Sequence, residues 1–385
     1  MDIEHLYIHV PFCAGKCAYC AFYSVPNASA DLQRRFIAAT GLELGGLQQR
    51  GNARVLPRTV YLGGGTPSML GADGLRALSA RLHDHVDFSS VEEWTCELTP
   101  ATATPKIFAA LRGMGVTRAS LGVQTFDPGV AGQLGRHEAD VAACFRAART
   151  AGIENIGLDL IAGLPGASKR MWKKDLEAAL ALRPEHISVY ALSVEEGTAV
   201  AVMERENPGL LPPDEEVLFR LNMAAERFCA AGFSRYEISN YARPGRECRH
   251  NLAVWRGGDF LGIGPAAFSR AGLRRWANRP DAGGYVSRLE RGGEPEREEN
   301  ELDATADACE RGLTALRLEE GWDAAACAKK FPAFAPHVPR FVETLQGLST
   351  HGLVADIENR WILTPRGREV ADAVTRELLA RMNVG

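Results

Sequence analysis

Short apolar runs alternate with longer amphipathic segments along the first two thirds of the chain. Each run rich in β-branched residues ends in a polar or glycine-rich turn, and the segment after it has the apolar spacing of a helix. The predicted strands cover residues 6–10, 59–62, 93–98, 119–123, 156–161 and 186–192. The predicted helices cover residues 32–47, 74–85, 105–113, 139–151 and 169–182. This βα repeat favours an α/β fold with a parallel sheet.

Six βα units are fewer than the eight of a closed (β/α)₈ barrel, so the pattern predicts a partial (β/α)6 TIM-like barrel over residues 1–231. Its sheet either stays open or is closed by other elements. In parallel α/β folds, chemistry gathers at the carboxyl ends of the strands. The residues at those ends include Cys13, Gly64, Glu97, Gln124 and Asp159.

The pattern becomes irregular after the barrel. Residues 232–300 form an accessory segment rich in glycine, arginine and aromatic residues, and its end at 291–300 is predicted to be a solvated linker. Helical spacing returns at 304–316, 324–330, 338–351 and 366–382, with a short strand at 361–364. These elements predict a mainly helical, winged-helix-like domain over residues 301–385. Its mixed charge favours an interaction or lid role over DNA binding.

The amino-acid composition and net charge disfavour several classes of protein. The 385 residues carry a formal net charge of −4, with 46% hydrophobic and 24% charged residues. A globular protein is indicated, and nucleic acid is disfavoured as a partner. The acidic amino terminus is unlike a signal peptide, and no apolar stretch approaches the ~20 residues of a membrane span. We therefore expect a soluble, cytoplasmic protein with no integral membrane segment.

Three of the nine cysteines crowd into one short loop. Cys13, Cys17 and Cys20 follow the first predicted strand in the run YIHVPFCAGKCAYC, and the other six are expected to be inert buried thiols. Iron-sulfur clusters are normally held by four thiolates, so three cysteines leave one iron open to a non-protein ligand. Zinc is the alternative, but it would want a fourth ligand, for which His9 is the only candidate in reach.

This loop resembles the signature C-x₃-C-x-Φ-C of the radical S-adenosylmethionine (radical SAM) superfamily, with Tyr19 as the aromatic residue. The resemblance implies a 4Fe-4S cluster whose open iron chelates S-adenosylmethionine and which, when reduced, splits it to a 5′-deoxyadenosyl radical. It also implies that the GGGTP run at 63–67 contacts the methionine end of S-adenosylmethionine. Taken alone, that run would be read equally well as a plain βα turn.

A closer resemblance covers nearly the whole chain. The segments LYIHVPFC (6–13), VYLGGGTPS (60–68), SLGVQTFD (120–127), GLDLIAGLPG (157–166), YEISNYARPG (236–245) and HNLAVW (250–255) resemble the family of oxygen-independent coproporphyrinogen III oxidase and its HemW relatives. By this resemblance the S-adenosylmethionine pocket is lined by Tyr7, Tyr19, Gly64, Gly65, Thr66, Glu97, Gln124, Arg136 and Asp159. An arginine can bind a carboxylate bidentately, while carboxylates and amides can bind amine and ribose groups. As the alternative, Glu97 and Asp159 would be strand-end carboxylates paired with arginine.

The absence of a fourth cysteine from the loop indicates which branch of this family the chain resembles. The oxidase would require a fourth cysteine two residues beyond Cys20, where this chain has Phe22, and a longer amino-terminal arm. The HemW branch is understood as a haem-binding chaperone that supplies respiratory haem proteins. The resemblance implies that His250 binds haem and that a reductant such as flavodoxin or ferredoxin serves the cluster. Val254 and Phe268 depart from the family pattern and bear on the haem site.

Two other activities stay open at this point. One is oxidative decarboxylation of coproporphyrinogen III in porphyrin biosynthesis, and the other is the chemistry of a radical methyltransferase or haem-cleaving relative. The sequence leaves undecided whether the protein is an enzyme.

Overall fold

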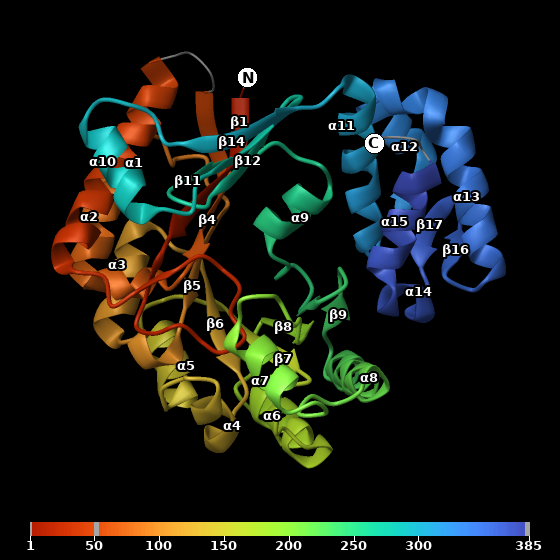
Figure 1. Cartoon of the computed structure of the whole chain (residues 1–385), viewed down its shortest axis with the longest axis horizontal. Coiled ribbons are helices and arrows are strands. Elements are labelled where there is room, and N and C mark those ends of the chain that lie inside the picture. Colours follow the sequence, from red (N-terminus) through yellow and green to blue (C-terminus); the bar gives the residue numbers. More distant parts are fainter. Residues whose placement is uncertain (1, 50–53, 382–385) are drawn as a thin grey trace.

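The computed structural model describes residues 2–49 and 54–381 (Figure 1). All six predicted strands form and pair in parallel in chain order, so the predicted parallel α/β fold is confirmed. They are β1 (Asp2–Val10), β4 (Arg54–Gly64), β5 (Glu93–Leu98), β6 (Arg118–Gln124), β7 (Asn155–Ala162) and β8 (His186–Ala191).

Three strands from residues 232–300 extend this sheet at both edges. β11 (Leu261–Ile263) pairs in parallel with β1, while β10 (Asn240–Ala242) pairs antiparallel with β8 and with β9 (Ser234–Arg235). The resulting order is β11-β1-β4-β5-β6-β7-β8-β10-β9. Among the described residues β11 and β9 do not pair with each other, so the sheet is a curved, open barrel.

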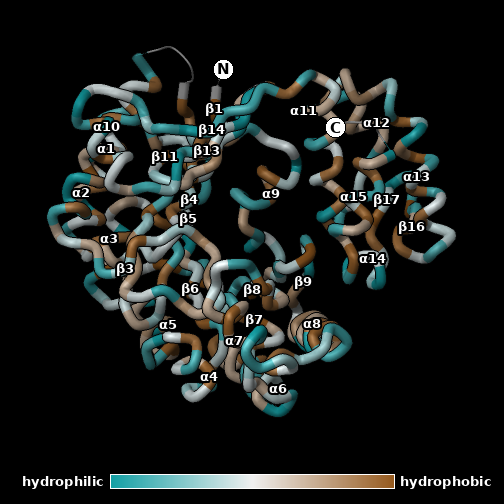
Figure 2. Tube along the Cα trace, in the orientation of Figure 1, coloured by the Kyte–Doolittle hydropathy of each residue, from teal (hydrophilic) through white to brown (hydrophobic). Residues whose placement is uncertain are grey.

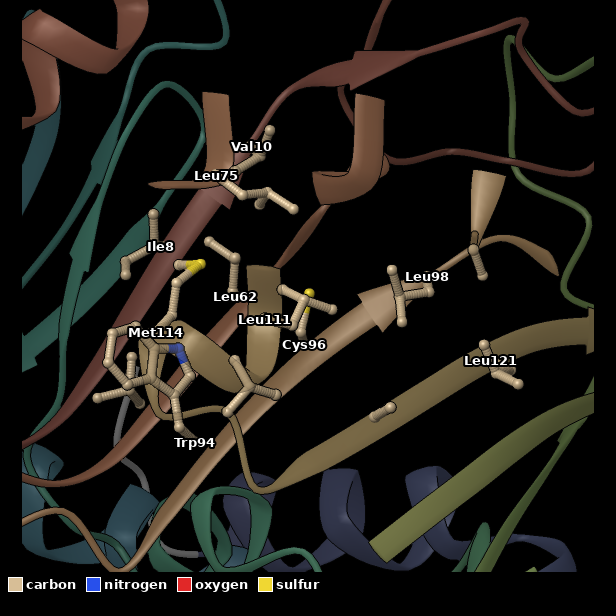
Figure 3. Close-up of a cluster of buried hydrophobic side chains, with 14 of the residues drawn as sticks. Ile8, Val10, Leu62, Leu75, Trp94, Cys96, Leu98, Leu111, Met114 and Leu121 are labelled. Atoms are coloured by element: carbon tan, nitrogen blue, oxygen red, sulfur yellow. The ribbon is translucent and has the colours of Figure 1, made fainter. Parts of the chain in front are cut away.

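Helices cover the outer face of the barrel (Figure 1). They are α1 (Ala30–Gln49), α2 (Gly71–His83), α3 (Pro105–Met114), α5 (Val141–Thr150), α6 (Lys169–Ala181) and α8 (Asp214–Ala230). Successive strand residues point to opposite faces. Ile8, Leu62 and Trp94 therefore pack under the helices in the main core (Figure 3), whereas Tyr7 and Tyr61 face the barrel interior.

The carboxyl-terminal part has a second core, built around Trp322, Phe334 and Phe341. Its elements are α11 (Ala304–Thr314), α12 (Ala324–Lys330), α13 (Val338–Thr350), α14 (Pro365–Glu369) and α15 (Ala371–Arg381), with the strands β15 (Trp322–Asp323), β17 (Arg360–Leu363) and β16 (Val354–Ile357). Hydrophobic and hydrophilic positions alternate along these helices in Figure 2, as expected for helices buried on one face.

Two predicted segments differ from the structure. The helix predicted at 366–382 is interrupted at Val370, which has the non-helical φ and ψ angles −124° and 30°, and its last residue lies outside the described residues. The linker predicted at 291–300 is wrong for its second half, because β14 (Arg297–Glu301) pairs antiparallel with β13 (Arg274–Asn278). Charged side chains hid this strand, since edge strands with exposed charges lack an apolar alternation.

The remaining elements connect these units. They are β2 (Phe12–Cys13), β3 (Val25–Pro26), α4 (Pro128–Gln133), α7 (Ala199–Glu206), α9 (Arg249–Trp255), β12 (Phe268–Ala271) and α10 (Ala282–Glu290), and the 3₁₀ turns η1 (Pro67–Leu70), η2 (Pro100–Thr102), η3 (Ala315–Arg317) and η4 (Pro332–His337).

A buried carboxyl group ties the accessory segment to the barrel. Glu43 of α1 accepts hydrogen bonds from the Tyr285 hydroxyl at 2.6 Å, the Asn278 amide at 2.8 Å and the Gly264 backbone N–H at 2.9 Å. The side chain is 1% exposed, and burial raises its pKa. A single side chain therefore joins α1, α10 and the strands at this edge of the sheet.

Replacing Glu43 should be costly because three buried donors would lose their acceptor. Glu43→Ala is expected to lower the free energy of unfolding by about 3 kcal/mol, measured by urea denaturation. Its neighbour Leu42 is 48% exposed, and Leu42→Ala should cost less than about 0.5 kcal/mol. Equal losses in the two variants would contradict this account of the edge.

Candidate functional site

The cysteine loop leaves the carboxyl end of β1 and is fixed at several points. The Ala18 N–H donates to the Leu134 carbonyl at 3.0 Å, and the Ala18 carbonyl accepts from the Val200 N–H at 2.9 Å. Tyr19 packs against a small cluster of apolar side chains beneath it. Cys13, Cys17 and Cys20 are unpaired and only partly buried. The three thiols are therefore held in place and remain accessible.

The glycine run lies directly beside this loop. The Gly65 and Thr66 N–H groups donate to the Val10 and Phe12 carbonyls at 2.8 and 2.7 Å, and the Thr66 hydroxyl lies 3.6 Å from the Cys13 sulfur. A Cβ on Gly65 would sit 2.7 Å from the Phe12 carbonyl oxygen, and Gly64 has a φ of +108°. Only glycine fits this approach of the two segments.

Arg136 joins the cysteine loop to the barrel. Its guanidinium donates to the Tyr19 hydroxyl at 2.9 Å and to the Gly122 carbonyl of β6, and it lies 3.7 Å from the Cys17 sulfur. Arg136 therefore links the cysteine loop to β6 through hydrogen bonds.

Two carboxyl groups form the acidic part of the inner wall. Glu97 accepts from the Tyr61 hydroxyl at 2.7 Å and from the Gly64 N–H at 3.2 Å. Desolvation inside the barrel, with a contribution from Asp159, raises the pKa of Glu97 to about 7. Desolvation also raises the pKa of Asp159. A nearby cation would therefore favour the ionised form of both carboxyl groups.

Gln124 ends β6 in a strained conformation. Its φ is +69°, and its side-chain oxygen is buried without a hydrogen-bond partner in the described structure. The turn after it is held by buried Asp175, which accepts from the Thr125 hydroxyl at 2.8 Å and the Phe126 N–H at 2.7 Å. An unpaired buried acceptor at a strand end is typical of a site that binds a ligand.

The structure thus brings the nine residues predicted for S-adenosylmethionine, and the three cysteines, to one mouth of the barrel. Partly buried thiols, a backbone cradle and two carboxyl groups with raised pKa values fit a cluster and a cationic ligand beside it. Within residues 2–49 and 54–381, no three His, Cys, Asp or Glu side chains converge on a single-ion site. A 4Fe-4S cluster does not require that geometry, because each cysteine binds a different iron.

His250 lies elsewhere. It belongs to α9, and its Nδ1 is 2.9 Å from the hydroxyl of Thr59, five residues before Gly64 on β4. Five residues of strand correspond to about 16 Å. The side chain is 6% exposed and packs on Tyr61 with ring centroids 5.2 Å apart, and burial lowers its pKa to about 3. His250 is therefore distant from the glycine run, and Tyr61 lies between His250 and Glu97.

A buried glutamate anchors the start of α9. Glu93, 4% exposed at the beginning of β5, accepts from the Arg249 and His250 N–H groups, both at 3.1 Å, and from the Cys248 thiol at 3.6 Å. Free N–H groups at a helix start need acceptors, and here another element supplies them.

Sequence reasoning missed Thr59, Tyr61 and Glu93. A signal for them was present, because Thr59 and Tyr61 alternate with Gly63 along β4 and so share its face. In the same way Glu93 shares the face of Glu97 on β5. Polar residues at every second position of an otherwise apolar strand mark the inner wall.

The comparisons agree with the cysteine loop and the partial barrel, which define a radical SAM protein. The family model described as Radical SAM superfamily matches residues 7–179. Membership of this superfamily implies a 4Fe-4S cluster and S-adenosylmethionine. The solved structure of coproporphyrinogen III oxidase (HemN) from Escherichia coli has the same fold, with a TM-score of 0.84 over 98% of this chain and 90% of that one at 22% identity.

Relatives named "Heme chaperone HemW" have a higher sequence identity to this chain than the HemN structure has. The protein from Mycobacterium tuberculosis (strain ATCC 25618 / H37Rv) is 36% identical over 97% of this chain and 94% of its own length. The protein from Bacillus subtilis (strain 168) is 30% identical over 99% of this chain and 100% of its own length. The chain belongs to the HemW family. No helix in the described part of the chain is long and apolar enough to cross a membrane.

The anchor of α9 can be tested by removing it. Glu93→Ala should lower the free energy of unfolding by about 2 kcal/mol and speed hydrogen exchange of the amides at 249–255, since buried donors lose their acceptor. Glu92 is the matched control. It forms exposed ion pairs with Arg58 and Arg249, so Glu92→Ala should cost under about 1 kcal/mol. Unchanged exchange in Glu93→Ala would show that α9 is held by other contacts.

Proposed function

We propose that this protein is a cytoplasmic haem chaperone that binds haem and passes it to respiratory haem proteins. The observation that carries the proposal is the near full-length match to proteins named "Heme chaperone HemW". The cysteine loop supports it, because Phe22 stands where the oxidase would need a fourth cysteine. Phe22 is 71% exposed beside the cluster loop.

The cluster and S-adenosylmethionine belong at the barrel mouth in this proposal. Cys13, Cys17 and Cys20 would each bind one iron, and the nine residues predicted from the sequence would hold S-adenosylmethionine beside it. When bound and reduced by a donor such as flavodoxin or ferredoxin, the cluster supplies the electron that cleaves S-adenosylmethionine. The protein itself would position the ligand through the backbone of the glycine run at 63–67. Glu97 and Asp159 would balance the ligand's charge.

Haem would dock beside α9, the helix that carries His250. Imidazole is a common axial ligand of haem iron. Two facts support this location: α9 is fixed to the barrel by Glu93, and it lies between the barrel and the carboxyl-terminal part (Figure 1). Haem at this place would leave the barrel mouth free for S-adenosylmethionine.

The function is tested with anaerobically reconstituted full-length protein. Haem titration should give a saturable Soret band, the bound haem should transfer to an apo haem protein, and His250→Ala should weaken haem binding. Incubation with coproporphyrinogen III, S-adenosylmethionine and a reductant should release no carbon dioxide. His351→Ala, an exposed change on the carboxyl-terminal part, serves as the control.

Two results would overturn this proposal. Carbon dioxide release with formation of protoporphyrinogen would assign the protein to the oxidase branch. Absence of saturable haem binding in the wild-type protein would remove the chaperone function itself.

Binding of S-adenosylmethionine should depend on pH through Glu97. With a pKa of about 7, this carboxyl is mostly neutral at pH 6 and ionised at pH 8, so the fraction able to attract the ligand's positively charged amine rises about tenfold. We expect anaerobic calorimetry to show tighter binding as pH rises across this range, and Glu97→Gln to lose the step near pH 7. Exposed Glu196→Gln should keep it. A step that persists in Glu97→Gln would assign it to another group.

A further inference from the structure

Two of the residues predicted to contact S-adenosylmethionine belong to one continuous segment at the barrel mouth. Gln124 is the last residue of β6, and Arg136 follows α4, which begins directly after the turn at 125–127. Both side chains therefore depend on the path of the backbone through this turn. The residues that fix the turn bear on the ligand site as well.

The turn begins with a strained residue. The register of β6 on β7 shifts between Gly122 and Gln124, and Gln124 has a φ of +69°. Such irregularities next to binding sites re-aim a side chain. A residue other than glycine keeps a left-handed conformation only where its surroundings hold it there. Contacts from outside β6 must therefore stabilise the turn.

Asp175 of α6 supplies such contacts from the outer layer of the fold. Its carboxylate accepts from the Thr125 hydroxyl at 2.8 Å and from the Phe126 N–H at 2.7 Å, and the side chain is 4% exposed. Hydrogen bonds to an ionised acceptor are stronger than those between neutral groups. Asp175 lies on the buried face of α6 together with Trp172 and Leu176. The turn is thus tied to a helix that packs on the outside of the sheet.

A chain of hydrogen bonds extends this attachment to α4. The Thr125 hydroxyl, which donates to Asp175, also accepts from the Asp127 N–H at 3.1 Å. The Asp127 carboxylate caps α4 by accepting from the Val130 N–H at 3.0 Å. Because Arg136 comes just after α4, its position is connected to the same buried carboxylate as that of Gln124.

Gly122 allows the two polar groups to lie over the same stretch of backbone. A Cβ on Gly122 would sit 3.1 Å from Nε2 of Gln124 and 3.8 Å from Nη2 of Arg136, and the guanidinium donates to the Gly122 carbonyl. Oε1 of Gln124 stays buried without a hydrogen-bond partner in the described structure. This oxygen is an acceptor available to a hydroxyl or amine of a ligand.

We propose that Asp175 is a positioning residue of the S-adenosylmethionine site, which fixes the turn that presents Gln124 and Arg136 to the ligand. The inference rests on the proposed function, which places S-adenosylmethionine at the barrel mouth. It deepens that function by naming a residue of α6 that acts through the turn. Without the two hydrogen bonds to Asp175, Gln124 would relax toward an ordinary backbone conformation and its amide would point away from the ligand.

The test measures S-adenosylmethionine binding to the anaerobically reconstituted full-length protein by calorimetry. Asp175→Asn keeps the shape of the side chain but loses its charge, and it should weaken binding about tenfold. Thr125→Val should also weaken binding, whereas Thr125→Ser keeps the hydroxyl and should bind as the wild-type protein does. Glu177→Gln, an exposed change on the same helix, is the control. Iron content and circular dichroism should match the wild-type protein in every variant.

A double-mutant cycle separates positioning from a general loss of stability. In a Gln124→Gly background the strained residue and its amide are absent, so adding Asp175→Asn should weaken binding by less than about threefold. General destabilisation would instead weaken binding by the same factor in both backgrounds.

Three results would overturn the inference: wild-type affinity in Asp175→Asn, equal affinities of Thr125→Val and Thr125→Ser, or an equal effect of Asp175→Asn in both backgrounds. Each would leave haem binding, and with it the chaperone function, in place. A wild-type protein that binds no haem would remove the chaperone function, while the calorimetry would still decide the role of Asp175. If the wild-type protein binds no S-adenosylmethionine, the ligand site and this inference both fall.

Discussion

The alternation of side chains along parallel strands is the constraint on which the other features depend. On each strand one set of residues packs under helices, as Ile8 and Leu62 do, and the other set faces a polar interior. A polar interior must find its hydrogen-bond partners inside the barrel. The contacts of Tyr61 with Glu97 and of Thr59 with two histidines meet this requirement. The same strands therefore build a core on one face and binding groups on the other.

Polar contacts also hold the parts of the chain together where apolar packing ends. Glu43 fixes the accessory segment at one edge, and Glu93 fixes α9 at the base of the barrel. Each is a buried carboxyl group that accepts several hydrogen bonds from a different element. Because such a group loses all its partners at once when its element moves, these attachments are specific in geometry as well as favourable in energy.

The sequence predicted the parts of the molecule that repeat or follow strong local signals. The six strands followed from apolar runs, and the loop of Cys13, Cys17 and Cys20 was apparent from spacing. The edge strand β14 was missed because its charged residues give no apolar pattern. The pairing of His5 with Thr59 depends on strand register, and the burial of His250 depends on how α9 seats against β4. Neither is encoded in local spacing, so only the folded chain reveals them.

The separation along β4 has a consequence for the chemistry. Gly64 ends β4 and Thr59 lies at its middle, about 16 Å away along the strand. Abstraction of a hydrogen atom by a carbon radical needs the two reacting atoms in contact. A group beside Thr59 would therefore lie outside the contact distance of a radical formed beside Gly64. Tyr61 lies between the two groups of residues, because its hydroxyl donates to Glu97 and its ring packs on His250.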